Sequence, residues 1–120
     1  MKKLEEEAKK FMQLHNKSMI TADEYQRKAG ETAIYPKKEA LPYLSLGLVS
    51  EAGEVAGKVK KLIRDGTESD VASEVGDVLW YCAMLASEVG VSLGKIMENN
   101  LEKLNDRKQR GKLQGSGDTR

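Results

Sequence analysis

The feature that constrains the fold most is an internal repeat, in which residues 48–63 and residues 71–86 carry one pattern at an offset of 23 positions. In both segments apolar residues recur at spacings of three and four, which lines one face of an α-helix. Two such helices joined by a short connection are expected to pack as an antiparallel pair through these faces. The matching positions are Leu48, Ala52, Val55, Ala56, Val59, Leu62 and Ile63, and Val71, Val75, Val78, Leu79, Cys82, Leu85 and Ala86.

The remainder of the chain is also helical in pattern. Thr21 followed by Glu24 has the form of a capping box, and Gly66 and Gly90 stand where helices are expected to end. Ser92 then opens a last helix, and no segment alternates apolar and polar residues as a strand would. The sequence predicts an all-α bundle of four to five helices, at about residues 2–18, 22–29, 42–63, 70–89 and 92–110.

A chain of 120 residues is expected to form one domain. Residues 1–20 are predicted to be an amphipathic helical extension, and its one histidine, His15, is interpreted as a packing residue rather than a catalytic one. Residues 21–110 form the domain itself, with a loop over residues 31–40. The glycine-rich residues 111–120 are predicted to be a flexible tail until something binds them.

Composition indicates an oligomer more than a free-standing globule. Apolar residues make up 39% of the chain and aromatic residues only 5%, which leaves part of the core to be completed by a second copy, in a homodimer or homotetramer. The net charge of +1 gives no overall attraction to a nucleic acid polymer or to an anionic membrane. A single cysteine and the lack of a long apolar run are consistent with a cytoplasmic protein.

The repeated segments also carry a repeated acidic motif, because Glu51 and Glu54 in the first align with Glu74 and Asp77 in the second. On each helix the first acid falls on the rim of the apolar stripe and the second about 60° further round. Antiparallel packing then brings four carboxylates to one cleft, a crowding that divalent cations relieve. Magnesium is the expected ion, with manganese as a possible substitute, because it prefers oxygen ligands and shares them with phosphates.

Each motif also holds a glycine, Gly53 or Gly76, which weakens a helix by about 1 kcal/mol relative to alanine. Close approach of another backbone or of a ligand would explain that cost. The competing interpretation of the acids is a solvated helix face, which is common. A di-iron carboxylate site is a poor fit, because it requires histidines on two of the helices.

Further polar residues are candidates for substrate binding. Asn100, Lys103, Arg107 and Arg110 lie within about 80° of one another on the last predicted helix and form a basic edge suited to phosphate, or else a solvated face. Lys61 belongs to a basic run that could serve phosphates or stabilise the end of its helix. Trp80 points away from its own apolar stripe, towards a partner subunit or a nucleobase, and Tyr81 lies on the acidic side.

These motifs resemble those of the MazG-like nucleotide pyrophosphohydrolases, an all-α superfamily, from about Ala22 to the end of the chain. The resemblance implies that Glu51, Glu54, Glu74 and Asp77 bind magnesium. It also implies that Lys103 and Arg107, with Asn100 nearby, contact phosphates, and that Gln26 and Trp80 contact the nucleoside. The matching features are Tyr25-Gln26, Thr32, Tyr35-Pro36, the segments 47–55 and 74–81, Asn100, Lys103, Arg107 and the closing residues 115–120.

The resulting hypothesis is a magnesium-dependent enzyme that hydrolyses nucleoside triphosphates to monophosphate and diphosphate, with Glu54 taking the proton of the attacking water. A narrower superfamily activity, on deoxyuridine triphosphate or phosphoribosyl-ATP, is a second hypothesis. A non-catalytic helical oligomer whose acids only keep it in solution is the third. A substrate panel separates the first two, and magnesium-dependent thermal melting separates the third.

Overall fold

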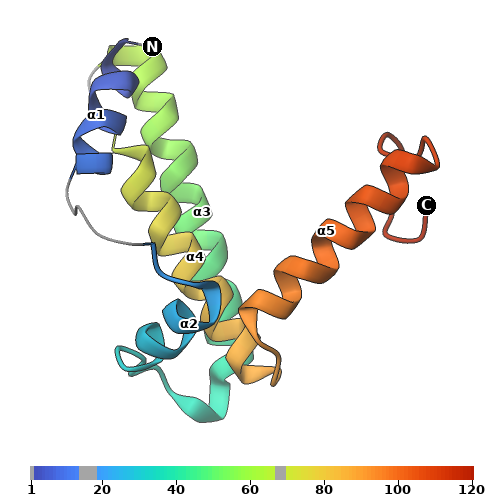
Figure 1. The fold of residues 1–120 in the computed structure, drawn as a ribbon. Helices are drawn as coiled ribbons and strands as arrows, with labels where there is room; N and C mark the ends of the chain where they lie inside the picture. The colour runs from blue at the N-terminus through green and yellow to red at the C-terminus, as the bar shows by residue number, and fades with distance from the viewer. Residues whose placement is uncertain (1, 14–18, 67–69) are drawn as a thin grey trace.

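The computed structural model describes residues 2–13, 19–66 and 70–120, and within these ranges every regular element is helical, as predicted. Figure 1 shows α3 and α4 as a long pair, with α2 at one end and α5 leading away from it. No described helix has both the length and the apolar character needed to cross a membrane. The elements are α1 (Lys2–Gln13), α2 (Ala22–Gly30), the 3₁₀ helix η1 (Lys37–Glu39), α3 (Ala40–Asp65), α4 (Val71–Glu88) and α5 (Leu93–Gln109).

The antiparallel pair of α3 and α4 is the most extensive helix–helix contact in the described chain, which confirms the pairing expected from the repeat. Gly66 caps the C-terminus of α3. Its φ of 66° lies in the left-handed region, and its N–H donates to the Leu62 carbonyl at 2.8 Å. Glycine adopts this conformation without a Cβ penalty, so the chain can leave α3 sharply. Gly66 therefore fixes the end of α3, and the repeated apolar pattern accounts for the pairing of α3 with α4.

The buried core lies at one end of this pair, where the start of α3 and the end of α4 meet α2 and the start of α5. Leu44 and Met84 are its two largest fully buried side chains, and Tyr35 from the connecting loop closes it. Capping side chains hold the entering helices, because Thr21 accepts from the Glu24 N–H at 3.1 Å. The remaining members of the buried cluster are three alanines and one leucine: Ala29, Ala40, Ala83 and Leu93.

The loop before α3 is fastened to the end of α4 by polar contacts. The Tyr35 hydroxyl donates to Glu88, and the Lys37 ammonium lies 3.2 Å from the same carboxylate and 4.4 Å from the Tyr35 ring centroid. Burial is the main cause of the raised pKa of Tyr35, and the hydrogen bond from Tyr35 is the main cause of the lowered pKa of Glu88. The predicted loop over residues 31–40 is thus ordered, and it contains η1.

Part of the apolar surface is left uncovered within one chain, as a core completed by a second copy would require. The apolar stripes of α3 and α4 are only partly covered within one chain: Leu48, Val55 and Val78 are half-buried, whereas Ile63 is 81% exposed. A stripe wider than one partner helix leaves its outer half uncovered. Helix α1 has no buried residue over its described length; the predicted helix over residues 2–18 is described only to Gln13, and His15 lies outside the described residues.

Because one fully buried leucine anchors the small core, we predict that Leu44→Ala lowers the free energy of unfolding by about 2–5 kcal/mol, through lost apolar burial and the cavity left behind. Urea denaturation measures this difference. The matched control is Ile34→Ala, since Ile34 is 96% exposed and its truncation should change stability by no more than about 0.5 kcal/mol. Equal losses in the two variants would contradict this location of the core.

Candidate functional site

Three of the four predicted acids come together at the interface of α3 and α4. Glu51 from α3 and Glu74 and Asp77 from α4 each place one carboxylate oxygen within 4.8 Å of the other two. The antiparallel packing places the rims of the two apolar stripes side by side, so equivalent positions of the repeat meet. Three oxygen donors at this separation form a set suited to a hard divalent cation.

The environment of Glu74 shows how crowded these charges are. Its pKa is raised, first by burial and then by the negative charge of Asp77, while Lys58 acts in the opposite direction. Glu54 and Glu51 add further repulsion. Since like charges in a partly desolvated site oppose ionisation, a bound cation would stabilise all of these carboxylates in their charged form. The donor set therefore fits magnesium.

Glu54 lies at the border of this group. Its carboxylate is exposed and is not one of the three that converge, although it is near enough to raise the pKa of Glu74. It follows Glu51 by three residues on the same helix, which turns it further towards water. The structure thus assembles three predicted acids closely and places the fourth beside them.

Lys58 lies in the site, although the sequence interpretation had selected Lys61 from the basic run that contains both residues. Its ammonium lies 4.0 Å from a Glu74 carboxylate oxygen, and both side chains are mostly covered. The signal was present in the spacing, because Lys58 follows Glu54 by four residues and Glu51 by seven on one helix face. Lys61, the predicted phosphate contact from this basic run, is exposed and acts on Asp65 near the end of α3.

Tyr81 joins the acidic side of the site, as expected, by packing on the backbone of α3. A Cβ added to Gly47 would lie 2.1 Å from the Tyr81 ring, so only glycine allows this approach. Burial, then Tyr43, Glu51 and Asp77, raise the pKa of the Tyr81 hydroxyl.

The close approach that we expected at Gly53 and Gly76 is absent within the described chain, where nothing lies within 4 Å of either added Cβ. An explanation based on another backbone segment of the same chain is therefore wrong for these two glycines. The open space beside both is compatible with a ligand or a second copy.

The two predicted nucleoside contacts are both engaged in packing the fold. The Trp80 indole is half-buried and donates to Thr32 at 2.9 Å, so its own chain covers part of a ring that was predicted to meet a partner subunit or a nucleobase. The Gln26 amide donates to Ser87 and to the Val91 carbonyl and accepts from the Leu93 N–H at 2.7 Å. These bonds join α2 to the connection between α4 and α5, and a nucleoside contact stays a prediction for both residues.

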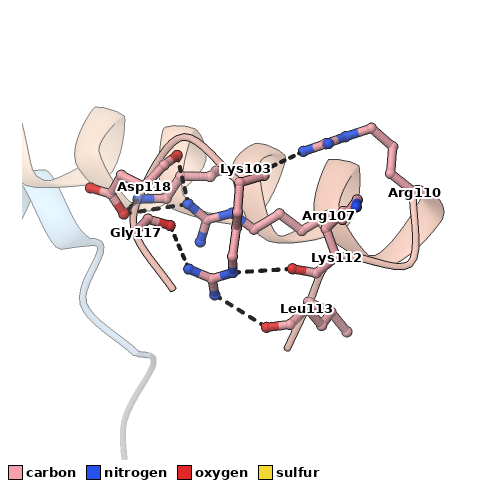
Figure 2. Close-up of polar contacts among 8 residues, drawn as sticks. Lys103, Arg107, Arg110, Lys112, Leu113, Gly117 and Asp118 are labelled. Atoms are coloured by element: carbon pink, nitrogen blue, oxygen red, sulfur yellow. Dashed lines mark hydrogen bonds and ion pairs between the residues drawn. The ribbon is translucent and has the colours of Figure 1, made fainter. Parts of the chain in front are cut away.

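The predicted basic edge lies on α5, in two parts. Asn100 and Lys103, with Ile96 and Asn99, line a shallow hollow of about 290 Å³. Nearer the end of the helix, Lys103, Arg107 and Arg110 contact the chain that follows (Figure 2). Because α5 leads away from the pair of α3 and α4, this edge lies apart from the three carboxylates within one chain (Figure 1).

Comparison with known proteins places these features in a family. The family model for the MazG nucleotide pyrophosphohydrolase domain matches residues 41–111, which is more than half of the chain. The chain belongs to the MazG family. The match includes both acidic motifs and the whole of α5, so the carboxylate cluster and the basic edge lie within the part that MazG proteins share.

The chain is similar to the Gene 37 protein of Mycobacterium phage L5, with 47% identity over 111 residues. The aligned region covers 82% of this chain and 97% of the phage protein. No solved structure matches the chain. Helices α1 and α2 lie outside the family match, so the MazG assignment rests on α3, α4 and α5.

From the contact of Gly47 with Tyr81 we predict that Gly47→Ala destabilises the protein by about 1–3 kcal/mol, because the new methyl group overlaps the ring. Thermal or urea denaturation measures the loss. Gly57→Ala on the same helix is the control, since nothing lies within 4 Å of its added Cβ and the better helix propensity should stabilise by up to about 1 kcal/mol. A Gly47→Ala protein as stable as the Gly57→Ala protein would contradict this packing.

Proposed function

We propose that this MazG protein is a nucleoside triphosphate pyrophosphohydrolase, which converts (d)NTP and water to (d)NMP and diphosphate in a magnesium-dependent reaction in the cytoplasm. The observation that carries the proposal is the convergence of Glu51, Glu74 and Asp77, with their oxygens within 4.8 Å, inside the segment that matches the family. Carboxylates this close together repel one another unless a cation neutralises them, so their convergence supports a metal site.

In this proposal Glu51, Glu74 and Asp77 hold the metal, and Glu54 completes the set from the border of the cluster. A magnesium ion held by these carboxylates would supply positive charge to neutralise the polyphosphate and to polarise its phosphoryl oxygens. The exposed carboxylate of Glu54 accepts the proton of the attacking water, so no covalent intermediate on the protein is needed. Lys58 limits the repulsion at Glu74 and adds a positive charge beside the phosphates.

The basic edge of α5 binds the phosphates in this proposal, through Lys103, Arg107 and Arg110, with Asn100 at its start. Figure 1 shows α5 leading away from α3 and α4, the helices that carry the carboxylates of the same chain. In this proposal the two halves of the site therefore meet across subunits. The uncovered outer half of the α3 stripe supports the same conclusion: Ala56, Val59 and Ile63 line an open apolar hollow of about 670 Å³. A homodimer or homotetramer would bury this surface.

The role of Glu54 leads to the prediction that Glu54→Gln lowers diphosphate release by about 10²- to 10⁴-fold, because the general base is lost while the fold is kept. A panel of nucleoside triphosphates with magnesium, assayed for diphosphate, measures this change and ranks the substrates. Glu98→Gln is the control, because Glu98 is an exposed acid of α5 that pairs with Lys95. Full activity of the Glu54→Gln protein would defeat the assignment.

A separate variant, Glu74→Gln, tests metal binding at a carboxylate that is not the proposed base. Magnesium should raise the melting temperature of the wild-type protein, since a ligand that binds the folded state stabilises it, and Glu74→Gln should lose most of that rise. A fold that melts at one temperature with and without magnesium would instead favour the non-catalytic alternative.

For the assembly, we predict that Ile63→Glu converts an oligomer to monomers and abolishes activity, because a charge placed in an apolar contact must be desolvated. Light scattering coupled to size-exclusion chromatography gives the mass. Ile34→Glu, in an exposed loop away from the stripe, should leave both mass and activity unchanged. A wild-type protein that is active as a monomer would refute the shared site.

A further inference from the structure

The last ten residues fold back onto the end of α5 and contact its cations (Figure 2). The Arg107 guanidinium donates to the Asp118 main-chain carbonyl at 2.8 Å and to the Asp118 carboxylate at 3.3 Å. The Lys103 ammonium lies 3.2 Å from the same carboxylate. Two of the proposed phosphate-binding cations thus share one acidic partner from the tail.

Arg120 holds this tail in shape by bonds to its backbone. Its guanidinium donates to the carbonyls of Lys112, Leu113 and Gly117 at 3.1, 3.1 and 2.6 Å. Its own main-chain oxygen accepts from Arg110 at 2.8 Å. Gly117, with a φ of 82°, permits the reversal that returns Asp118 to the helix. The tail is a closed loop with its acceptor groups directed at α5.

The consequence for Arg107 is nearly complete burial. It is 4% exposed, and it is the one charged residue in the described chain that falls in the buried class. A phosphate cannot reach this guanidinium while the tail is in place. Carboxylate and phosphate oxygens satisfy guanidinium and ammonium donors in the same way, so Asp118 occupies the position that a phosphate would take.

We propose that residues 111–120 are an internal ligand of the α5 anion site, which a polyphosphate must displace to reach Arg107. The proposal rests on the phosphate-binding role given to α5 under the proposed function. Displacement is easy, because Asp118 is 83% exposed and water screens its ion pairs. A polyphosphate brings several negative charges to the same donors and replaces one carboxylate.

The first test measures binding of inorganic pyrophosphate by calorimetry, with a chelator present so that the carboxylate cluster plays no part. Asp118→Asn should bind about threefold to tenfold more tightly than the wild-type chain, because the competing carboxylate is gone. Asp106→Asn removes the same charge from the same edge, where Asp106 pairs with Arg110 at 2.8 Å, but does not uncover Arg107. An equal gain in both variants would show a charge effect only and would overturn the proposal.

The second test asks whether pyrophosphate binds more tightly or more weakly when Arg120 is replaced. Arg120→Ala removes a positive charge, so general electrostatics predicts weaker binding of pyrophosphate. Loss of the bonds that shape the tail predicts tighter binding, by about threefold or more. Tighter binding, together with faster amide exchange over residues 111–120 when pyrophosphate is added to the wild-type chain, supports displacement. Weaker binding, or a tail equally protected with and without pyrophosphate, refutes it.

Two further variants separate this proposal from the proposed function. If α5 is the anion site, Arg107→Ala and the more exposed Lys103→Ala each weaken pyrophosphate binding. Unchanged affinity in the folded Lys103→Ala protein would refute the anion site itself, and the tail proposal with it. Weakened binding there, without tighter binding in Asp118→Asn and Arg120→Ala, would refute only the role of the tail.

Discussion

The rest of the structure depends on the pairing of α3 with α4 through matched apolar stripes. Burial of these stripes holds Glu51, Glu74 and Asp77 with their oxygens within 4.8 Å of one another. Without that apolar contact, repulsion between the like charges would drive the carboxylates apart. The repulsion is partly offset by Lys58. The apolar contact therefore maintains the acidic site. A bound cation would reduce the repulsion among its carboxylates.

Local signals made much of the fold predictable. The capping role of Thr21, the left-handed Gly66 and the capping Ser92 each follow from the chemistry of one or two residues, and the structure has all three. The direction of α5 was not predictable, because it depends on contacts between distant residues, such as the bond from the Gly94 N–H to Asp23 at 2.8 Å. Periodicity shows which face of a helix is apolar, but not how much of that face its own chain covers.

The site divides in the same way. A repeat with fixed spacing determines the register of two helices, so the sequence could predict that the acids converge. The contact of Tyr81 with Gly47 joins residues of different helices and has no sequence signal beyond a glycine in an apolar helix. Trp80 was interpreted from the stripe of its own helix, and Thr32 and Tyr35, which cover it, come from a loop that this reasoning did not place. The position of Lys58 was predictable from its spacing, because it lies on the same helix face as Glu51 and Glu54.

The two charged regions that are proposed to bind a substrate each have partners of opposite charge within the chain, and the degree of compensation differs between them. The carboxylates have Lys58 at 4.0 Å from Glu74, an incomplete compensation that leaves the Glu74 pKa raised. The cations of α5 have Asp118 and backbone oxygens, a compensation close enough to bury Arg107. Under the proposed function, a magnesium–triphosphate complex would bring a cation to the carboxylates and would replace Asp118 with a phosphate at the α5 cations. Metal and phosphate would then act on two different charge imbalances, one at the interface of α3 and α4 and the other at the end of α5.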